Sequence, residues 1–168
     1  MYNLTKVKRW IKAAAKRNLV YNAEEQLISD SCVLIRAYPN THPAILEVFG
    51  HLKGGQLLHG QRRDAFRLAP MMAPASEEVI DSGLRYTKQA RPKKEYRVLY
   101  LRKNGEKIII DQKYAELFKN FEDCTLTTNK TRSPVVITRD YEIIGVIALV
   151  IPAMTEDEFL NTFRFTTN

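Results

Sequence analysis

Two periods of hydrophobic and polar positions run along this chain, and the changes of period mark its elements. Residues 4–17 place apolar side chains three and four positions apart, which predicts an amphipathic helix. Two short apolar runs around Ser29-Asp30 predict a hairpin. Residues 41–53 repeat the helical period and stop at Gly54-Gly55, which predicts a second helix.

The rest of the chain is irregular at first and then returns to strands. Residues 54–83 are broken by glycine and proline, with one or two helical turns expected at 75–83. Further elements are predicted, in chain order, as a strand at 84–91, a hairpin at 95–111 through Asn104-Gly105, a helix at 112–121, strands at 124–129, 133–140 and 142–152, and a tail helix within 154–168.

A helix followed by strands therefore occurs twice, with the irregular segment between. We predict an α+β fold and a single domain over residues 1–168. The first unit is 1–38, the insertion 39–94 and the second unit 95–153, before the tail at 154–168. The strand "EIIGVIALVIP" is apolar on both faces, so we expect both of its faces to be covered.

The charge is uneven, and the first helix concentrates it. The 168 residues carry a net charge of +7, with nineteen Lys or Arg against nine acids in 1–103 and seven against ten in 104–168. No acid precedes Glu24, so ion pairs within the helix cannot balance its cations. We predict a DNA phosphate-binding face made of Lys6, Lys8, Arg9, Lys12, Lys16 and Arg17.

The C-terminal third resembles the closing segment of a bacterial DNA sliding clamp. The stretch "IIIDQKYAELFKNF" resembles the clamp's strand-to-helix motif of the type N-x-x-Y-L, with Asp111 at the first position of the motif and Tyr114 at its tyrosine position. It is followed by Ser133-Pro134 with an apolar strand, and by a last strand ending in "ALVIP". The resemblance covers 1–38 and 95–153.

The resemblance implies a domain of two helix-plus-sheet units, whose helices present Lys and Arg to DNA inside a ring. Clamp rings use six such domains, and this chain has the length of one with an insertion. A ring would then require a homo-oligomer. The resemblance implies sequence-independent DNA binding, or a clamp-like scaffold for DNA-processing proteins, of a kind that would suit a phage or a mobile element.

A Mg²⁺-dependent nuclease is an alternative for the same stretch. Asp81, Asp111 and Lys113 are the residue types that such a site needs, because carboxylates hold the metal and a lysine supports the attacking water. Asp111 also stands where a helix N-cap belongs, and that role needs no metal.

A protein-binding adaptor or inhibitor is the other alternative. Phe66, Leu68, Met71 and Met72 in the irregular segment either dock a partner or pack on the domain's own sheet. Tyr86, Tyr96 and Tyr100 alternate with cations, and they either stack bases or pack across strands.

The sequence carries none of the common catalytic motifs, and we predict no enzyme activity and no cofactor. His42, His51 and His59 are spaced too far apart for one helical face, so no metal site is expected. Cys32 and Cys124 are expected as reduced thiols. We expect a soluble cytoplasmic protein, because no apolar run is long enough to span a membrane.

Overall fold

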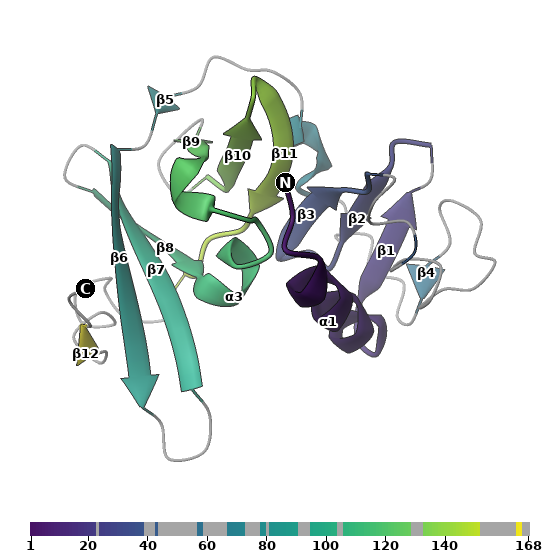
Figure 1. Ribbon diagram of the computed structural model, residues 1–168, viewed down its shortest axis with the longest axis horizontal. Helices are drawn as coiled ribbons and strands as arrows, with labels where there is room; N and C mark the ends of the chain where they lie inside the picture. Colours follow the sequence, from purple (N-terminus) through teal and green to yellow (C-terminus); the bar gives the residue numbers. More distant parts are fainter. Residues whose placement is uncertain are drawn as a thin grey trace.

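The computed structural model describes residues 1–22, 24–38, 43, 67–72, 108–128 and 133–151 in full, and the backbone of strands at 57–58, 78–79, 81–90, 95–103, 106–107 and 164–165 (Figure 1). Most of the helix predicted at 41–53, the Asn104-Gly105 turn and the three histidines lie outside these residues. So do the side chains of Tyr86, Tyr96 and Tyr100.

Eight strands of the described chain form one antiparallel sheet in the order β4-β1-β2-β3-β11-β10-β9-β5 (Figure 1). The strands are β1 (Leu19–Asn22), β2 (Leu27–Ser29), β3 (Val33–Arg36), β4 (Leu57–Leu58), β5 (Glu78–Val79), β9 (Thr125–Thr128), β10 (Val135–Arg139) and β11 (Glu142–Ile147). A second sheet has the order β12-β6-β7-β8, built from β6 (Asp81–Ala90), β7 (Glu95–Lys103), β8 (Glu106–Asp111) and β12 (Arg164–Phe165). The fold is mixed α+β.

The large sheet contains the same connection twice. Helix α1 (Leu4–Ala15) leads into β1, β2 and β3, and helix α3 (Gln112–Ala115) leads into β9, β10 and β11. The last strands of the two sets pair with each other, with Ile35 opposite Gly145. Each helix-plus-three-strand unit therefore supplies three of the six central strands of a continuous sheet, and β4 and β5 add one strand at each end.

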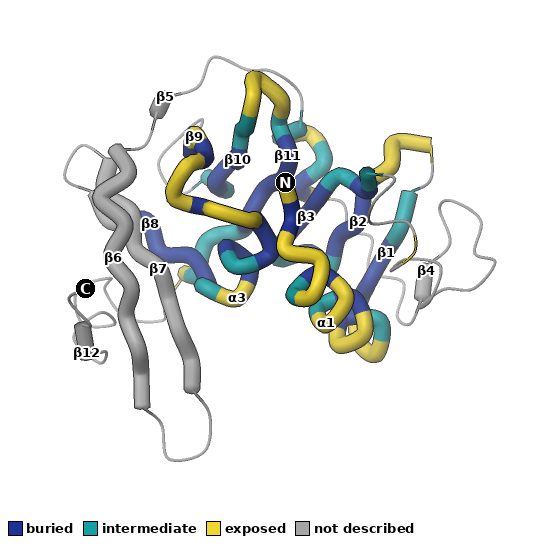
Figure 2. Tube along the Cα trace, viewed as in Figure 1, coloured by how far each residue is buried: buried dark blue, intermediate teal, exposed yellow. Residues whose placement is uncertain are grey.

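The main hydrophobic core lies between the helices and one face of the sheet. Val7 and Ile11 of α1 are fully buried there, and so are Ile35 and Ile137 of the strands. Figure 2 shows the central strands buried and the outer side of α1 exposed. Both helices therefore pack on the same face of the sheet.

A smaller core covers the opposite face of the central strands. Leu68 is buried against Leu34 and Val146, next to the 3-10 helix η1 (Ala69–Met72). Val146 and Ile147 point to opposite faces and both are fully buried. This confirms that β11 is covered on both sides, and the cover on the second face is this chain's own segment 67–72. The packing alternative is therefore right for Leu68, while Phe66 lies outside the described residues.

The helix predicted at 112–121 is wrong beyond Ala115. The backbone turns after Glu116, Phe118 forms a bridge with Tyr2, and Asn120 is left-handed with φ 50°. A short 3-10 helix η2 (Phe121–Asp123) follows. The apolar spacing looked helical because the turn and η2 also direct their aromatic side chains into the core.

Four other predicted bounds also need correction. Helix α1 ends at Ala15 rather than at 17. Strand β11 ends at Ile147, and beyond it the amide of Val150 donates to the Ile109 carbonyl of β8 (2.8 Å). The predicted turns at 75–83 contain strands at 78–79 and from 81, and the predicted tail helix contains a strand at 164–165. In these last two segments, tertiary pairing overrides the local propensity for helix. Strand β5 pairs with β9, and strand β12 pairs with β6.

Candidate nucleic-acid interface

Helix α1 begins where its sequence predicts an amphipathic helix. The Asn3 side chain accepts a hydrogen bond from the Lys6 amide (3.3 Å) and so caps the first turn. Val7, Ile11 and Ala14 form the buried stripe, which fixes which side of α1 faces the solvent.

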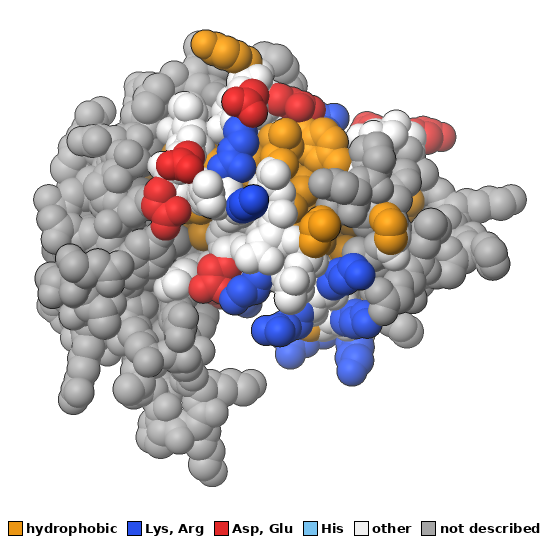
Figure 3. Space-filling model, viewed as in Figure 1, with side chains coloured by type: hydrophobic (Ala, Val, Ile, Leu, Met, Phe, Trp, Pro, Cys, Tyr) orange, Lys and Arg blue, Asp and Glu red, His pale blue; other side chains and the backbone are white. Residues whose placement is uncertain are grey.

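The solvent side of α1 carries cations along its whole length. Arg9, Lys12 and Lys16 follow at spacings of three and four, so they form one outward ridge. Lys8 and Arg17 flank this ridge, and all five side chains belong to exposed residues. Figure 3 shows the Lys and Arg side chains gathered over α1.

Lys6 departs from the prediction that these cations are unpaired. Its Nζ lies 2.7 Å from Glu116 Oε2, just after α3, and both side chains are partly exposed. The acid is 110 positions away in the sequence, so a search of the helix itself cannot find it. By contrast, Lys8, Arg9, Lys16 and Arg17 form no ion pair with any residue that the structure describes.

Helix α3 and the segment after it contribute little positive charge that nearby acids do not offset. Lys113 Nζ lies 2.9 Å from Asp111 Oδ2 and 4.5 Å from the centre of the Tyr114 ring. Lys119 is exposed, but the acids Glu122 and Asp123 follow it closely in the chain. The basic face is therefore a property of α1.

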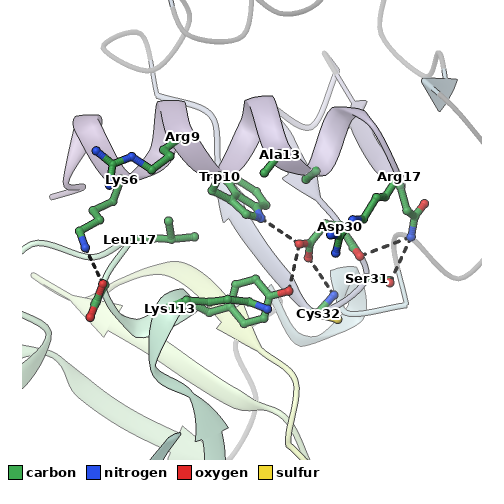
Figure 4. Close-up of a pocket in the computed structure, with 14 residues that line it drawn as sticks. Lys6, Arg9, Trp10, Ala13, Arg17, Asp30, Ser31, Cys32, Lys113 and Leu117 are labelled. Atoms are coloured by element: carbon green, nitrogen blue, oxygen red, sulfur yellow. Dashed lines mark hydrogen bonds and ion pairs between the residues drawn. The ribbon is translucent and has the colours of Figure 1, made fainter. Parts of the chain in front are cut away.

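A cavity of about 610 Å³ lies between α1 and α3 (Figure 4). Trp10 and Ala13 of α1 line it on one side and Tyr114 of α3 on the other. The cations at its rim are Lys6, Arg9, Arg17 and Lys113, and its acids are Asp30 and Glu116. A polar and aromatic hollow thus opens beside the basic ridge.

Asp30 connects the two helices at the floor of this cavity. Its Oδ2 accepts hydrogen bonds from Trp10 Nε1 (2.8 Å) and from the Tyr114 hydroxyl (3.2 Å). Its Oδ1 accepts from the amides of Cys32 (3.0 Å) and Val33 (2.9 Å). Burial raises the pKa of Tyr114, and the nearby Asp30 carboxylate raises it further, so the tyrosine stays protonated and remains a donor.

This Trp10-Asp30-Tyr114 cluster is absent from the sequence prediction. Its members lie 20 and 84 positions apart, and Asp30 reads locally as a hairpin turn. One signal is present, because a partly buried tryptophan normally finds a partner for its N–H group. The sequence alone does not say which acceptor it finds.

The nuclease residues are not brought together. Asp81 pairs with Arg102, whereas Asp111 pairs with Val98, which lies four residues earlier in β7, and the two partner strands lie on opposite sides of β7. With standard strand spacings, the two backbones are roughly 16 Å apart. Asp111 Oδ1 instead accepts a hydrogen bond from the backbone amide of Lys113 (3.0 Å), which confirms Asp111 as the N-cap of α3.

We expect Asp111→Ala to lower the free energy of unfolding by about 1 kcal/mol, because it leaves the Lys113 amide without its cap. Asp111→Asn keeps an acceptor and should cost little. Lys113→Ala is the matched control for the ion pair, whose exposed lysine contributes little. Urea denaturation measures all three variants. Mg²⁺-dependent DNA cleavage by the wild type that both Asp111 variants lose would contradict the capping role.

Other kinds of site find little support in the part of the chain that is described. No group of three His, Cys, Asp or Glu is placed to hold a metal ion there. Cys32 and Cys124 are both free thiols, and burial raises the pKa of Cys124. None of the helices among these residues is long and apolar enough to cross a membrane.

Comparisons of the chain with protein-family models, curated proteins and solved structures give no match.

Proposed function

We propose that this chain is a non-catalytic DNA-binding protein that holds the phosphate backbone through the basic face of α1, without reading sequence. One observation carries the proposal: four exposed cations on or next to α1, namely Lys8, Arg9, Lys16 and Arg17, have no ion-pair partner in the described structure. Like charges this close repel one another, and a polyanion removes that repulsion.

The dimensions of α1 suit a DNA backbone. A helix of twelve residues is about 18 Å long, and the major groove is about 12 Å wide. Cations spread from Lys8 to Arg17 can therefore meet phosphates on both sides of a groove. Contacts of this kind position a protein on DNA and carry no sequence information.

The architecture supports a clamp-like scaffold as the setting for this face. Two helix-plus-three-strand units share one sheet, and both helices contribute to the core on the same side of it. The clamp resemblance implies such a pair of units. In a ring of several copies, α1 would line the hole and supply most of the charge, because α3 is short and its Lys113 is paired. The mass of the protein in solution tests whether such a homo-oligomer exists.

The dependence of DNA affinity on salt tests the proposed face directly. Lys16→Gln should make the slope of log K against log salt shallower by about 0.9, the loss of one phosphate contact. Lys119→Gln removes the same charge from an exposed position outside α1 and should change the slope much less.

A second control removes an ion pair without changing net charge. The double variant Lys6→Gln/Glu116→Gln should leave the slope almost unchanged, because Glu116 already neutralises Lys6. Equal effects of Lys16→Gln and Lys119→Gln would mean that net charge alone drives binding, and the α1 assignment would then be wrong. Fluorescence anisotropy of a labelled duplex measures each slope.

A further inference from the structure

The cavity beside α1 has the size and the lining of a ligand site. Its volume of about 610 Å³ lies within the roughly 300–1,000 Å³ that small-molecule sites occupy. Trp10 is partly exposed there, and its hydrogen bond to Asp30 holds the indole in one orientation. A fixed aromatic ring at the wall of a hollow is a surface on which another planar ring can stack.

The charges at the rim divide into those that are already engaged and those that are available. Lys6 pairs with Glu116, Lys113 pairs with Asp111, and the Asp30 carboxylate accepts four hydrogen bonds. This leaves Arg9 and Arg17, which have no ion-pair partner among the described residues. The available charge of the cavity is therefore positive and comes from two guanidinium groups.

The order of these groups along the chain resembles the order of groups along a nucleic-acid strand. Arg9 lies in α1 and Arg17 lies just past its end, and Trp10 and Ala13, which line the same cavity, come between them in the sequence. In a bound strand, Arg9 and Arg17 would contact two phosphates, and the Trp10 ring would contact the base between them. Arginine is the side chain best suited to two-pronged contact with phosphate oxygens.

The mode of binding to the ring indicates which kind of base fits. Stacking on Trp10 requires a base whose face is free. An unpaired base offers that face, whereas a base inside an intact duplex is stacked between its neighbours.

We infer that this cavity takes an unpaired nucleotide of a DNA strand, with the base against Trp10 and the flanking phosphates on Arg9 and Arg17. The inference rests on the proposed function, because it uses two cations of the same face. It adds that single-stranded or locally unpaired DNA is bound in preference to intact duplex. Stacking on an aromatic side chain tolerates every base, so the lack of sequence preference is kept.

A variant that fills the cavity distinguishes binding of an unpaired strand in the cavity from binding of duplex DNA on the basic face of α1. Ala13→Leu adds an apolar side chain to the cavity from an exposed helical position, where both residues are good helix formers. It should weaken binding of an oligothymidylate roughly 5- to 150-fold, the value of one lost stacking contact, and leave the affinity for a blunt duplex unchanged. Thr5→Leu adds the same kind of side chain at an exposed position outside the cavity and should change neither affinity.

The wild type offers two local readouts that need no variant. Trp10 is the only tryptophan, so intrinsic tryptophan fluorescence reports on this cavity alone. Cys32 lines the cavity and is partly exposed, while Cys124 is buried. Oligothymidylate should therefore change the Trp10 fluorescence and slow the alkylation of Cys32. Thymidine monophosphate and inorganic phosphate at the same concentration should do so far less, because neither can engage both arginines and the ring.

Each other outcome overturns the inference. Ala13→Leu could affect both DNA forms alike or neither, or the free mononucleotide could protect Cys32 as well as the oligonucleotide does. Binding of duplex with no response to oligothymidylate would leave the proposed function standing and remove only the nucleotide site. Absence of binding to either DNA form would remove both.

Discussion

The quadruple variant Lys8→Glu, Arg9→Glu, Lys12→Glu and Lys16→Glu should lose its retention on DNA at low salt. All four positions are exposed on or at the end of α1, so the substitutions change the charge of the face and not its packing. Four lost phosphate contacts would reduce the salt slope by roughly 3 to 4, and the new carboxylates would repel phosphates as well. Retention on immobilised duplex, with circular dichroism to verify the fold, measures the result.

Net charge must be separated from location in this experiment, because the four reversals lower the formal charge from +7 to −1. The matched control adds Glu24→Lys, Glu25→Lys, Glu122→Lys and Asp123→Lys to the quadruple variant. These positions are exposed and lie outside α1, and the additions return the net charge to +7. Binding should remain absent. If it returns, the whole-protein charge attracts DNA and α1 has no special part.

The variants Val146→Asp and Ile147→Asp should each leave the protein largely unfolded. Both side chains are fully buried, Val146 in the smaller core with Leu68 and Ile147 in the main core beneath the helices. Each substitution loses about 1.5–3 kcal/mol of apolar burial and adds several kcal/mol for an unpaired buried carboxylate. Such a sum is comparable with the 5–15 kcal/mol by which a typical domain is stable.

Thr125→Asp is the matched control, since it places the same carboxylate at an exposed position in strand β9. Chemical denaturation and mass in solution should be followed for all three variants. If Val146→Asp stays folded with an altered mass, another copy of the chain meets this face in solution. If it is neutral in both measurements, segment 67–72 does not cover β11.

The sequence predicts the parts of this fold that depend on local pattern. The stripe of Val7 and Ile11 identifies α1, and the run of β-branched residues identifies β11 as buried on both faces. The helix after Asp111 is overestimated because the period of Tyr114, Leu117 and Phe118 reports burial, and a bridge and a left-handed residue can bury the same side chains.

The candidate site is predicted only in its outer part. The cations of α1 are adjacent in the sequence, so their clustering is visible without a structure. The Lys6–Glu116 pair and the Trp10-Asp30-Tyr114 cluster depend on how the two units meet, and no local rule links residues 84 or 110 positions apart. The hollow between α1 and α3 therefore emerges only with the tertiary structure.

The pairing of β3 with β11 also sets the order in which this protein can assemble during synthesis. Ile35 must wait for Gly145, 110 residues later, which takes roughly 5 to 20 seconds at ordinary translation rates. Until then the edge of β3 is an open, apolar strand that can pair with another nascent chain. Such a long-range closure also makes for slow folding. The first unit is thus open to such mispairing for as long as the rest of the chain is being made.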